Sequence, residues 1–184
     1  LIIFFFQKLF FLDSMDSFFK KLGKQNYLLV LFILFILFNF LLNRFMPQGL
    51  ALDIRFAYSA SEAYHLLEMM GEETREKYLM VIWALDTPYM MIYFLLLVGL
   101  FSKTWKRRKF LFLPVAIVAL DFLENVLVST LIVTFPTENY ILGYFASFFT
   151  TAKWVCVLGC VLFLIVGLVR NYVLRNQPDL DVKG

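Results

Sequence analysis

Four long apolar stretches constrain this chain more than any other feature of its 184 residues. They run over residues 27–46, 78–101, 110–135 and 142–169, and each supplies the roughly 20 residues that a helix needs to cross a bilayer. Hydrophobic residues make up 61% of the sequence and charged residues 17%, which is more apolar than a water-soluble domain. In lipid, a helix satisfies its backbone hydrogen bonds internally. The sequence therefore predicts an all-α integral membrane protein built as a four-transmembrane-helix bundle.

The basic residues predict how the bundle is oriented. Twelve of the 17 lysines and arginines lie before the first stretch, between the second and third, or after the fourth. Such an excess marks the cytoplasmic side of a membrane protein, so both termini and the short second connection are expected in the cytoplasm. An even number of spans agrees with this arrangement. The expected location is the inner (plasma) membrane of a bacterium, with several passes through the bilayer.

The segments that flank or interrupt the four stretches of the membrane domain, residues 27–169, are interpreted separately. Residues 1–26 begin with an apolar run that is too short to span a bilayer and lacks the small-residue cleavage site of a signal peptide. This run is either an interfacial helix or upstream sequence that precedes a natural start at Met15. Residues 47–77 are predicted to form an outer loop, and residues 170–184 a polar cytoplasmic tail.

The outer loop contains the pattern of a short amphipathic helix. Ser59 and Glu62 have the spacing of a capping box at a helix start. After them, apolar residues recur at the spacing of one helix face, and Gly71 is a natural end. These apolar residues are Ala63, Leu66, Leu67 and Met70. We expect this helix to lie on the outer face of the bundle or across its mouth.

Four ionisable residues lie inside the predicted spans, where an unpaired charge is strongly unfavourable. They are Asp86 in the second span, Asp121 and Glu124 in the third, and Lys153 in the fourth. Helical rise places Glu124 and Lys153 roughly 16 Å below the outer end of the bundle, and Asp86 roughly 12 Å below it. Asn125 leaves the third helix on the same face as the two carboxylates, and Asn39 adds a polar side chain to the first span. We expect these side chains to face one another.

The matched depths predict an ion pair between Lys153 and Glu124, which leaves two aspartates without a cation. Protonation, entry of water or a bound cation would balance them, or Arg55 of the outer loop would reach into the mouth. A buried pair can also serve only to lock helix packing and register. The number of polar residues favours a hydrated cavity over a purely structural pair. The residues predicted to line a ligand-binding or proton site are Asp86, Asp121, Glu124, Asn125, Lys153, Asn39 and Arg55.

Composition and missing motifs argue against several classes of function. A net charge of +3 is too small to indicate nucleic-acid binding. One histidine does not supply a histidine-rich metal site, and Cys156 and Cys160 have neither the spacing of a CxxC motif nor the number needed for a disulfide framework. No nucleotide-binding or nucleophile motif is present in the sequence. We therefore predict no metal and no cofactor, and we assign no catalytic residue.

The positions of the intramembrane carboxylates resemble a known layout. An acidic residue with a nearby proline, Asp86 and Pro88, lies in the second of four spans, and carboxylates lie in the third. In this layout the chain resembles the emopamil-binding and sigma-receptor-like sterol proteins, although the likeness extends to no longer run of residues. The resemblance implies that carboxylates in a bundle cavity hold a cationic ligand or move a proton.

Three functions are compatible with these features. The leading hypothesis is a polar cavity, open toward the outer leaflet, that binds a small amphipathic or lipid-like molecule, with acid–base chemistry as an option. The second is a proton- or cation-coupled small transporter, against which the third span has no polar residue between Phe110 and Asp121. The third is an accessory subunit of a larger membrane complex. The expected partners are membrane lipids, a small amphipathic ligand, and a second copy of the chain or a larger complex.

Overall fold

The computed structural model describes residues 18–19, 21–105 and 108–175, and these residues form helices and no strands. The helices are α2 (Gln25–Phe45), α3 (Ala60–Val81), α4 (Thr87–Thr104), α5 (Phe112–Thr134) and α6 (Tyr140–Arg175), with a π-helical turn at Ile82–Asp86 and a short 3-10 helix at Arg108–Leu111. Four segments are long and apolar enough to cross a membrane, namely Gln25–Phe45, Ala60–Thr104, Phe112–Thr134 and Tyr140–Val173. The prediction of an all-helical chain with four such helices is confirmed. Most of the predicted N-terminal segment, 1–17, and of the tail, 176–184, lies outside the described residues.

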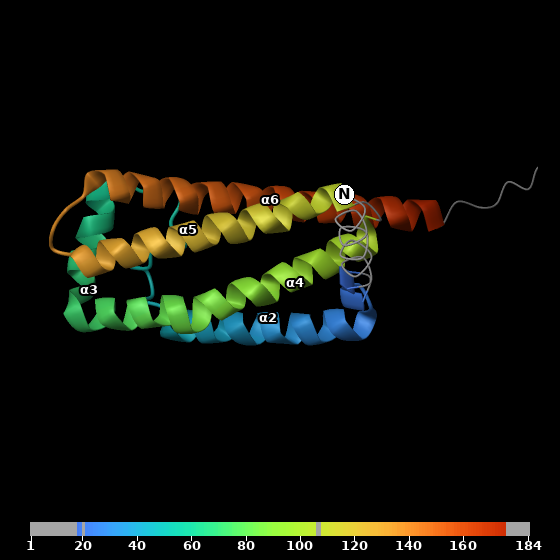
Figure 1. Ribbon diagram of the computed structural model, residues 1–184, viewed down its shortest axis with the longest axis horizontal. Helices are drawn as coiled ribbons and strands as arrows, with labels where there is room; N and C mark the ends of the chain where they lie inside the picture. The colour runs from blue at the N-terminus through green and yellow to red at the C-terminus, as the bar shows by residue number, and fades with distance from the viewer. Residues whose placement is uncertain (1–17, 20, 106–107, 176–184) are drawn as a thin grey trace, which may run out of the picture.

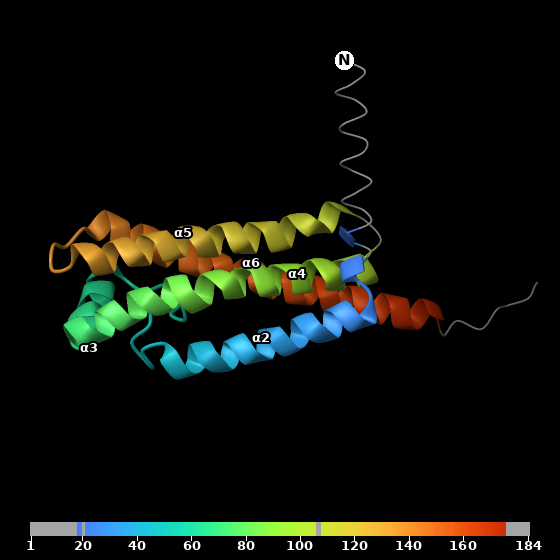
Figure 2. The same cartoon turned by 60° about the horizontal axis from the view of Figure 1, so that its bottom comes forward.

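Helices α2, α4, α5 and α6 run along one common axis, and the first part of α3 crosses one end of the bundle (Figure 1). α5 and α6 form an antiparallel pair, and α4 packs against both of them. α2 packs mainly on α4, so that α4 lies between α2 and α5 (Figure 2). α2 has two buried residues, Leu28 and Leu31, both in its first two turns, whereas the buried face of α5 runs almost its whole length. Helices α3 to α6 therefore build most of the core, and the start of α2 adds Leu28 and Leu31 to a cluster with Leu96 and Val98 of α4.

The buried face of α5 explains where the polar residues of the core lie. Its buried residues recur singly or in adjacent pairs about every three or four positions, and because a helix turns once in 3.6 residues they share one inward side. The two ends of this face are apolar and its middle is polar. The buried residues are Leu113, Pro114, Ile117, Asp121, Glu124, Asn125, Val128, Ser129, Leu131 and Ile132.

The first part of α3 has the predicted amphipathic pattern. Ser59 caps the helix by accepting a hydrogen bond from the Glu62 N–H at 3.1 Å. All four residues of the predicted apolar stripe are buried, and they pack with α5 residues such as Val128 and Leu131. Gly71 has φ 67° and ψ 167°, a conformation that favours a residue without a Cβ. The first straight part of the helix ends at Gly71, the predicted position. The chain bends there, and helical turns resume and continue to Val81.

A second irregularity lies where α3 passes into α4. Pro88 has no N–H to donate and its ring does not fit against a regular preceding turn, which accounts for the π-helical turn just before it. The Thr87 hydroxyl donates to the carbonyl of Ile82 at 3.1 Å and so satisfies part of the disturbed turn. Asp86, the last residue of this turn, is buried. The turn therefore sets where Asp86 leaves the helix.

The segment between α2 and α3 folds back against the bundle. Ala51, Leu52 and Tyr58 are each at most 4% exposed. Three hydrogen bonds hold this segment to α3 and α6. They join Leu52 N to Tyr78 Oη at 3.1 Å, Ala57 N to Thr151 Oγ1 at 3.1 Å, and Trp154 Nε1 to the Asp53 carbonyl at 3.0 Å. The segment consequently reaches the middle of α6, beside the polar part of the core.

Candidate functional site

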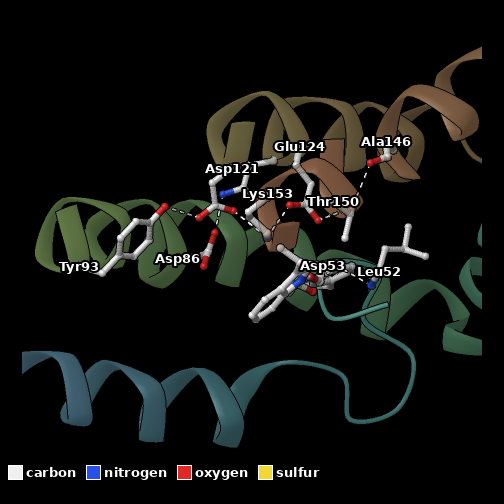
Figure 3. A network of polar contacts seen from close by, with 12 residues as sticks. Leu52, Asp53, Asp86, Tyr93, Asp121, Glu124, Ala146, Thr150 and Lys153 are labelled. Carbon is white, nitrogen blue, oxygen red and sulfur yellow. Dashed lines mark hydrogen bonds and ion pairs between the residues drawn. The ribbon is translucent and has the colours of Figure 1, made fainter. Parts of the chain in front are cut away.

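Lys153 of α6 bridges two carboxylates of α5 (Figure 3). Its Nζ lies 2.9 Å from Asp121 Oδ1 and 2.5 Å from Glu124 Oε2. The Glu124 side chain is 0% exposed and the other two are less than 10% exposed, so water hardly screens these ion pairs. The predicted pairing of Lys153 with Glu124 is present. The prediction that Asp121 lacks a cation is wrong, because both carboxylates leave α5 on the same side and one flexible ammonium reaches them together.

Each of these carboxylates also accepts a hydrogen bond from a hydroxyl. Tyr93 of α4 donates to Asp121 Oδ2 at 2.7 Å, and Thr150 of α6 donates to Glu124 Oε1 at 2.6 Å. Hydrogen bonds to a charged acceptor are about twice as strong as neutral ones. Asp121 and Glu124 are therefore each held by a shared cation and a hydroxyl of their own, and three helices contribute to the arrangement.

Asp86 has a neutral partner instead. Its Oδ2 accepts a hydrogen bond from Asn125 Nδ2 at 2.5 Å. None of the ion pairs among the described residues includes Asp86, although its side chain is buried. Asn125 directly follows Glu124 on α5. Its hydrogen bond to Asp86 therefore connects the π-helical turn with the residues that pair with Lys153. A carboxyl buried without a cation is unfavourable when it is charged.

The cluster also includes Asp53 of the segment before α3, which is not among the predicted site residues. Tyr78 of α3 donates to Asp53 Oδ1 at 3.0 Å. Burial raises the pKa of Asp53 above its usual value, and the Lys153 ammonium acts in the opposite direction. Tyr58 belongs to the same segment, and burial likewise raises the pKa of its hydroxyl. The segment before α3 thus brings a fourth carboxyl close enough to interact with the charges of Lys153 and Asp86.

Two of the predicted site residues, Arg55 and Asn39, make neither a hydrogen bond nor an ion pair with the buried carboxyls of the cluster. Arg55 donates to the carbonyl of Gly49 and pairs with Glu62 at 3.4 Å, so the option that it reaches into the mouth is not realised. Asn39 of α2 donates to Tyr89 Oη at 2.7 Å. The ring of Tyr89 packs edge-on against that of Tyr93, with centroids 5.3 Å apart. Asn39 therefore meets the edge of the network through two tyrosine rings.

Tyr78 and Tyr93 are members of the polar network that are not among the predicted site residues. Tyr93 follows Asp86 by seven residues, or about two helical turns, which places both on one face of the helix and could have revealed its role. Tyr78 precedes Asp86 by eight residues but is separated from it by the π-helical turn, which shifts the register. Asp53 follows no helical periodicity. Its position depends on the folding back of the segment, which no local pattern announces.

The site combines four carboxyls with one ammonium in a mostly buried network. Such an excess of acid over base can hold protons, exchange them with a bound molecule, or bind a group that donates hydrogen bonds. No group of three or more His, Cys, Asp or Glu side chains that could hold a metal ion occurs in the part of the chain that the structure describes. Cys156 and Cys160 are free thiols.

Comparison with known proteins identifies no relative whose function could be transferred to this chain. No protein-family model matches it, and neither a curated protein nor a solved structure matches it. The function is therefore inferred from the geometry of the site.

Proposed function

We propose that this chain is a membrane protein whose buried polar cluster binds a small amphipathic or lipid-like molecule and exchanges protons with its polar group. The observation that carries this proposal is the unequal treatment of the carboxyls. Lys153 neutralises part of the charge of Asp121 and Glu124, whereas Asp86 has an amide as its described partner. An uncompensated acid deep in an apolar bundle favours a polar group brought by a ligand.

The residues divide into two roles under this proposal. Lys153, with Thr150 and Tyr93, fixes Asp121 and Glu124 in place. Asp86 contacts the ligand, and Asn125 orients its carboxyl. Asp53 belongs to the segment before α3, on the side of the cluster where a polar head group would enter. The apolar part of the ligand would lie among the exposed apolar side chains of the helices, where lipid is expected.

The test is native mass spectrometry of the protein purified in a mild detergent. The parent protein is expected to carry a bound molecule with a defined mass, and Asp86→Asn is expected to lose it while keeping the Asn125 contact. Glu76→Gln is the matched control, because Glu76 is an exposed carboxylate of α3 outside the cluster. A parent protein that carries no such molecule, or an Asp86→Asn variant that carries it equally well, would contradict the proposal.

A second function, proton- or cation-coupled transport, is favoured by one observation. Tyr93, Asp121, Lys153, Glu124 and Thr150 form a continuous row of polar contacts across three helices. The row ends toward the start of α5, where the buried residues are apolar. If the row conducts, proteoliposomes should take up protons along an imposed gradient, as measured by an enclosed pH-sensitive dye, and Asp121→Asn should abolish the uptake.

The orientation and location complete the proposal. The four apolar helices suggest a membrane protein. The distribution of basic residues supports cytoplasmic termini, and it puts the first part of α3 on the outer face. The location that we propose is the plasma membrane of a bacterium. Reporter enzymes fused after Val173 and within the α5–α6 turn test this topology. The first fusion should be active only with a cytoplasmic reporter, and the second only with an exported one.

A further inference from the structure

Trp105, at the end of α4, forms an aromatic cluster with α6 at the end of the bundle opposite the α5–α6 turn. Its indole Nε1 donates to the carbonyl of Phe163 at 3.0 Å, and its ring lies 4.6 Å, between centroids, from that of Phe110. The indole rests on the bare backbone of Gly167, where an added Cβ would overlap with it. A larger residue than glycine would therefore displace the ring. The position of Trp105 is built into the fold.

Trp105 in turn orients Arg170, one helical turn further along α6. The Arg170 Cζ lies 4.8 Å from the Trp105 ring centroid, so the guanidinium lies over the indole as a cation–π pair. The neighbouring Asn171 donates to the carbonyl of Thr104 at 3.0 Å, which ties this turn of α6 to α4. Arg170 is exposed, and none of the ion pairs among the described residues includes it. A guanidinium has five N–H donors, and a contact with the indole ring leaves N–H groups available to an acceptor.

The charges around Arg170 are all positive in the part of the chain that the structure describes. Lys103 precedes Trp105 in the last turn of α4. Lys21 and Lys24 lie just before α2, whose start is packed closely on α4, since a Cβ at Gly99 would lie 2.8 Å from the Leu22 carbonyl oxygen. None of the described residues in 18–28, 98–112 and 160–175 is acidic. This end of the bundle is therefore complementary to an anion.

We propose that this end of the bundle binds the phosphate head group of an anionic phospholipid, with Arg170 as its principal ligand. A guanidinium held over an indole ring can give a phosphate two parallel hydrogen bonds, which a mobile lysine does not reproduce. Tryptophan is suited to the boundary between lipid and water, where a phospholipid head group lies. The lysines add attraction for net negative charge, which favours an anionic lipid over a zwitterionic one. The proposal does not depend on a ligand at Lys153.

The experiment is native mass spectrometry of the full chain in detergent, titrated separately with phosphatidylglycerol and with phosphatidylcholine of the same acyl chains. The parent protein should retain phosphatidylglycerol more tightly. Arg170→Gln should weaken that binding about tenfold, as the loss of a charge-assisted hydrogen bond implies. Arg170→Lys keeps the charge but not the planar fork, and should fall between the two. Arg44→Gln, in the last turn of α2 at the other end, is the matched control and should bind like the parent.

Several outcomes would overturn the proposal. Equal retention of the two lipids would show that anionic charge is not recognised. Binding of Arg170→Gln that matches Arg44→Gln would remove Arg170 from the site, and binding of Arg170→Lys that equals the parent would remove the oriented fork. Glycerol 1-phosphate serves as the arm without acyl chains, and binding as tight as that of the lipid would assign the site to a free phosphate. If Arg170→Gln does not fold, the Arg170→Lys titration decides the question.

Discussion

Asp121 and Glu124 differ from Asp86 and Asp53 in what compensates their burial. The first two share the Lys153 ammonium and each accept a hydrogen bond from a hydroxyl. The second two accept hydrogen bonds from an amide and a phenol. A buried charge with both a cation and a hydrogen-bond donor is stable in place, whereas one held by a neutral donor favours a proton or a bound group. This difference separates the part of the cluster that holds the helices together from the part that we propose meets a ligand.

The largest expected effect on stability concerns Lys153 and the two carboxylates that it pairs with, Asp121 and Glu124. Lys153→Met leaves two carboxylates buried without a cation, and should lower the free energy of unfolding in detergent by about 3–5 kcal/mol. The measurement is thermal or denaturant unfolding of the purified protein. Lys77→Met is the matched control, because Lys77 pairs with Glu73 on the exposed surface of α3, where water screens the pair and its loss should change the stability little. A Lys153→Met variant that unfolds like the parent would show that the lysine is not paired.

Removing the two carboxylates one after the other from the Lys153→Met variant sharpens this test. Glu124→Gln combined with Lys153→Met removes one of the two uncompensated carboxylates, and should recover part of the lost stability. Because Lys153 also contacts Asp121 at 2.9 Å, adding Asp121→Asn should recover more. Full recovery by the double variant alone would mean that the contact with Asp121 contributes nothing.

Thr150 gives the next effect in size. Thr150→Val replaces a hydroxyl with a methyl group of similar shape and removes the 2.6 Å hydrogen bond to Glu124. The expected loss is about 1–3 kcal/mol, because the acceptor is charged and buried. Thr150→Ser keeps the hydroxyl and should lose much less. Thr130→Val is the control, since that hydroxyl bonds to the Val126 carbonyl of its own helix, and an equal loss there would contradict the role of Thr150.

The pH dependence of stability tests the carboxyls without a shared cation, through Asp53. Its pKa is raised by burial, so the folded state keeps the proton to higher pH than the unfolded state. The stabilisation from this residue is complete below the pKa of the unfolded chain, near 4, and decreases as pH rises through the folded pKa. Asp53→Asn, which can still accept from Tyr78, should unfold with a weaker decline in stability from about pH 4 upward. An Asp53→Asn variant whose pH profile matches that of the exposed-site control Glu72→Gln would argue against a raised pKa of Asp53 in the folded protein.

Much of the fold follows from the sequence because hydrophobic length and helical period are local properties. The number of helices, the cap at Ser59 and the inward face of α5 are all present in the structure. The bend at Gly71 follows from its missing side chain. The sequence determines the π-helical turn before Pro88 less closely. A proline implies that the helix is disturbed, but it does not fix which turn of the helix is distorted.

The site was predictable where residues share a helix face and unpredictable where the chain folds back. Glu124 and Asn125 follow from their spacing after Asp121, and the pairing with Lys153 follows from depth. The reach of Lys153 to both carboxylates depends on side-chain rotamers, which a sequence does not fix. The entry of Asp53 and the exclusion of Arg55 depend on how the segment before α3 packs on α6, and that is a tertiary property.

The smallest expected change in stability is at Asp86. Asn has nearly the same shape as Asp, and Asp86→Asn can keep a hydrogen bond with Asn125 while removing a carboxyl that has no described cation. The free energy of unfolding should therefore change by less than about 1 kcal/mol, or rise slightly. The comparison is direct when the unfolding of Asp86→Asn and of Lys153→Met is measured side by side, because Asp86 and Lys153 are both buried ionisable residues. If Asp86→Asn were as destabilising as Lys153→Met, Asp86 would belong to the structural part of the cluster, and the carboxyl that we assign to the ligand would be holding the helices instead.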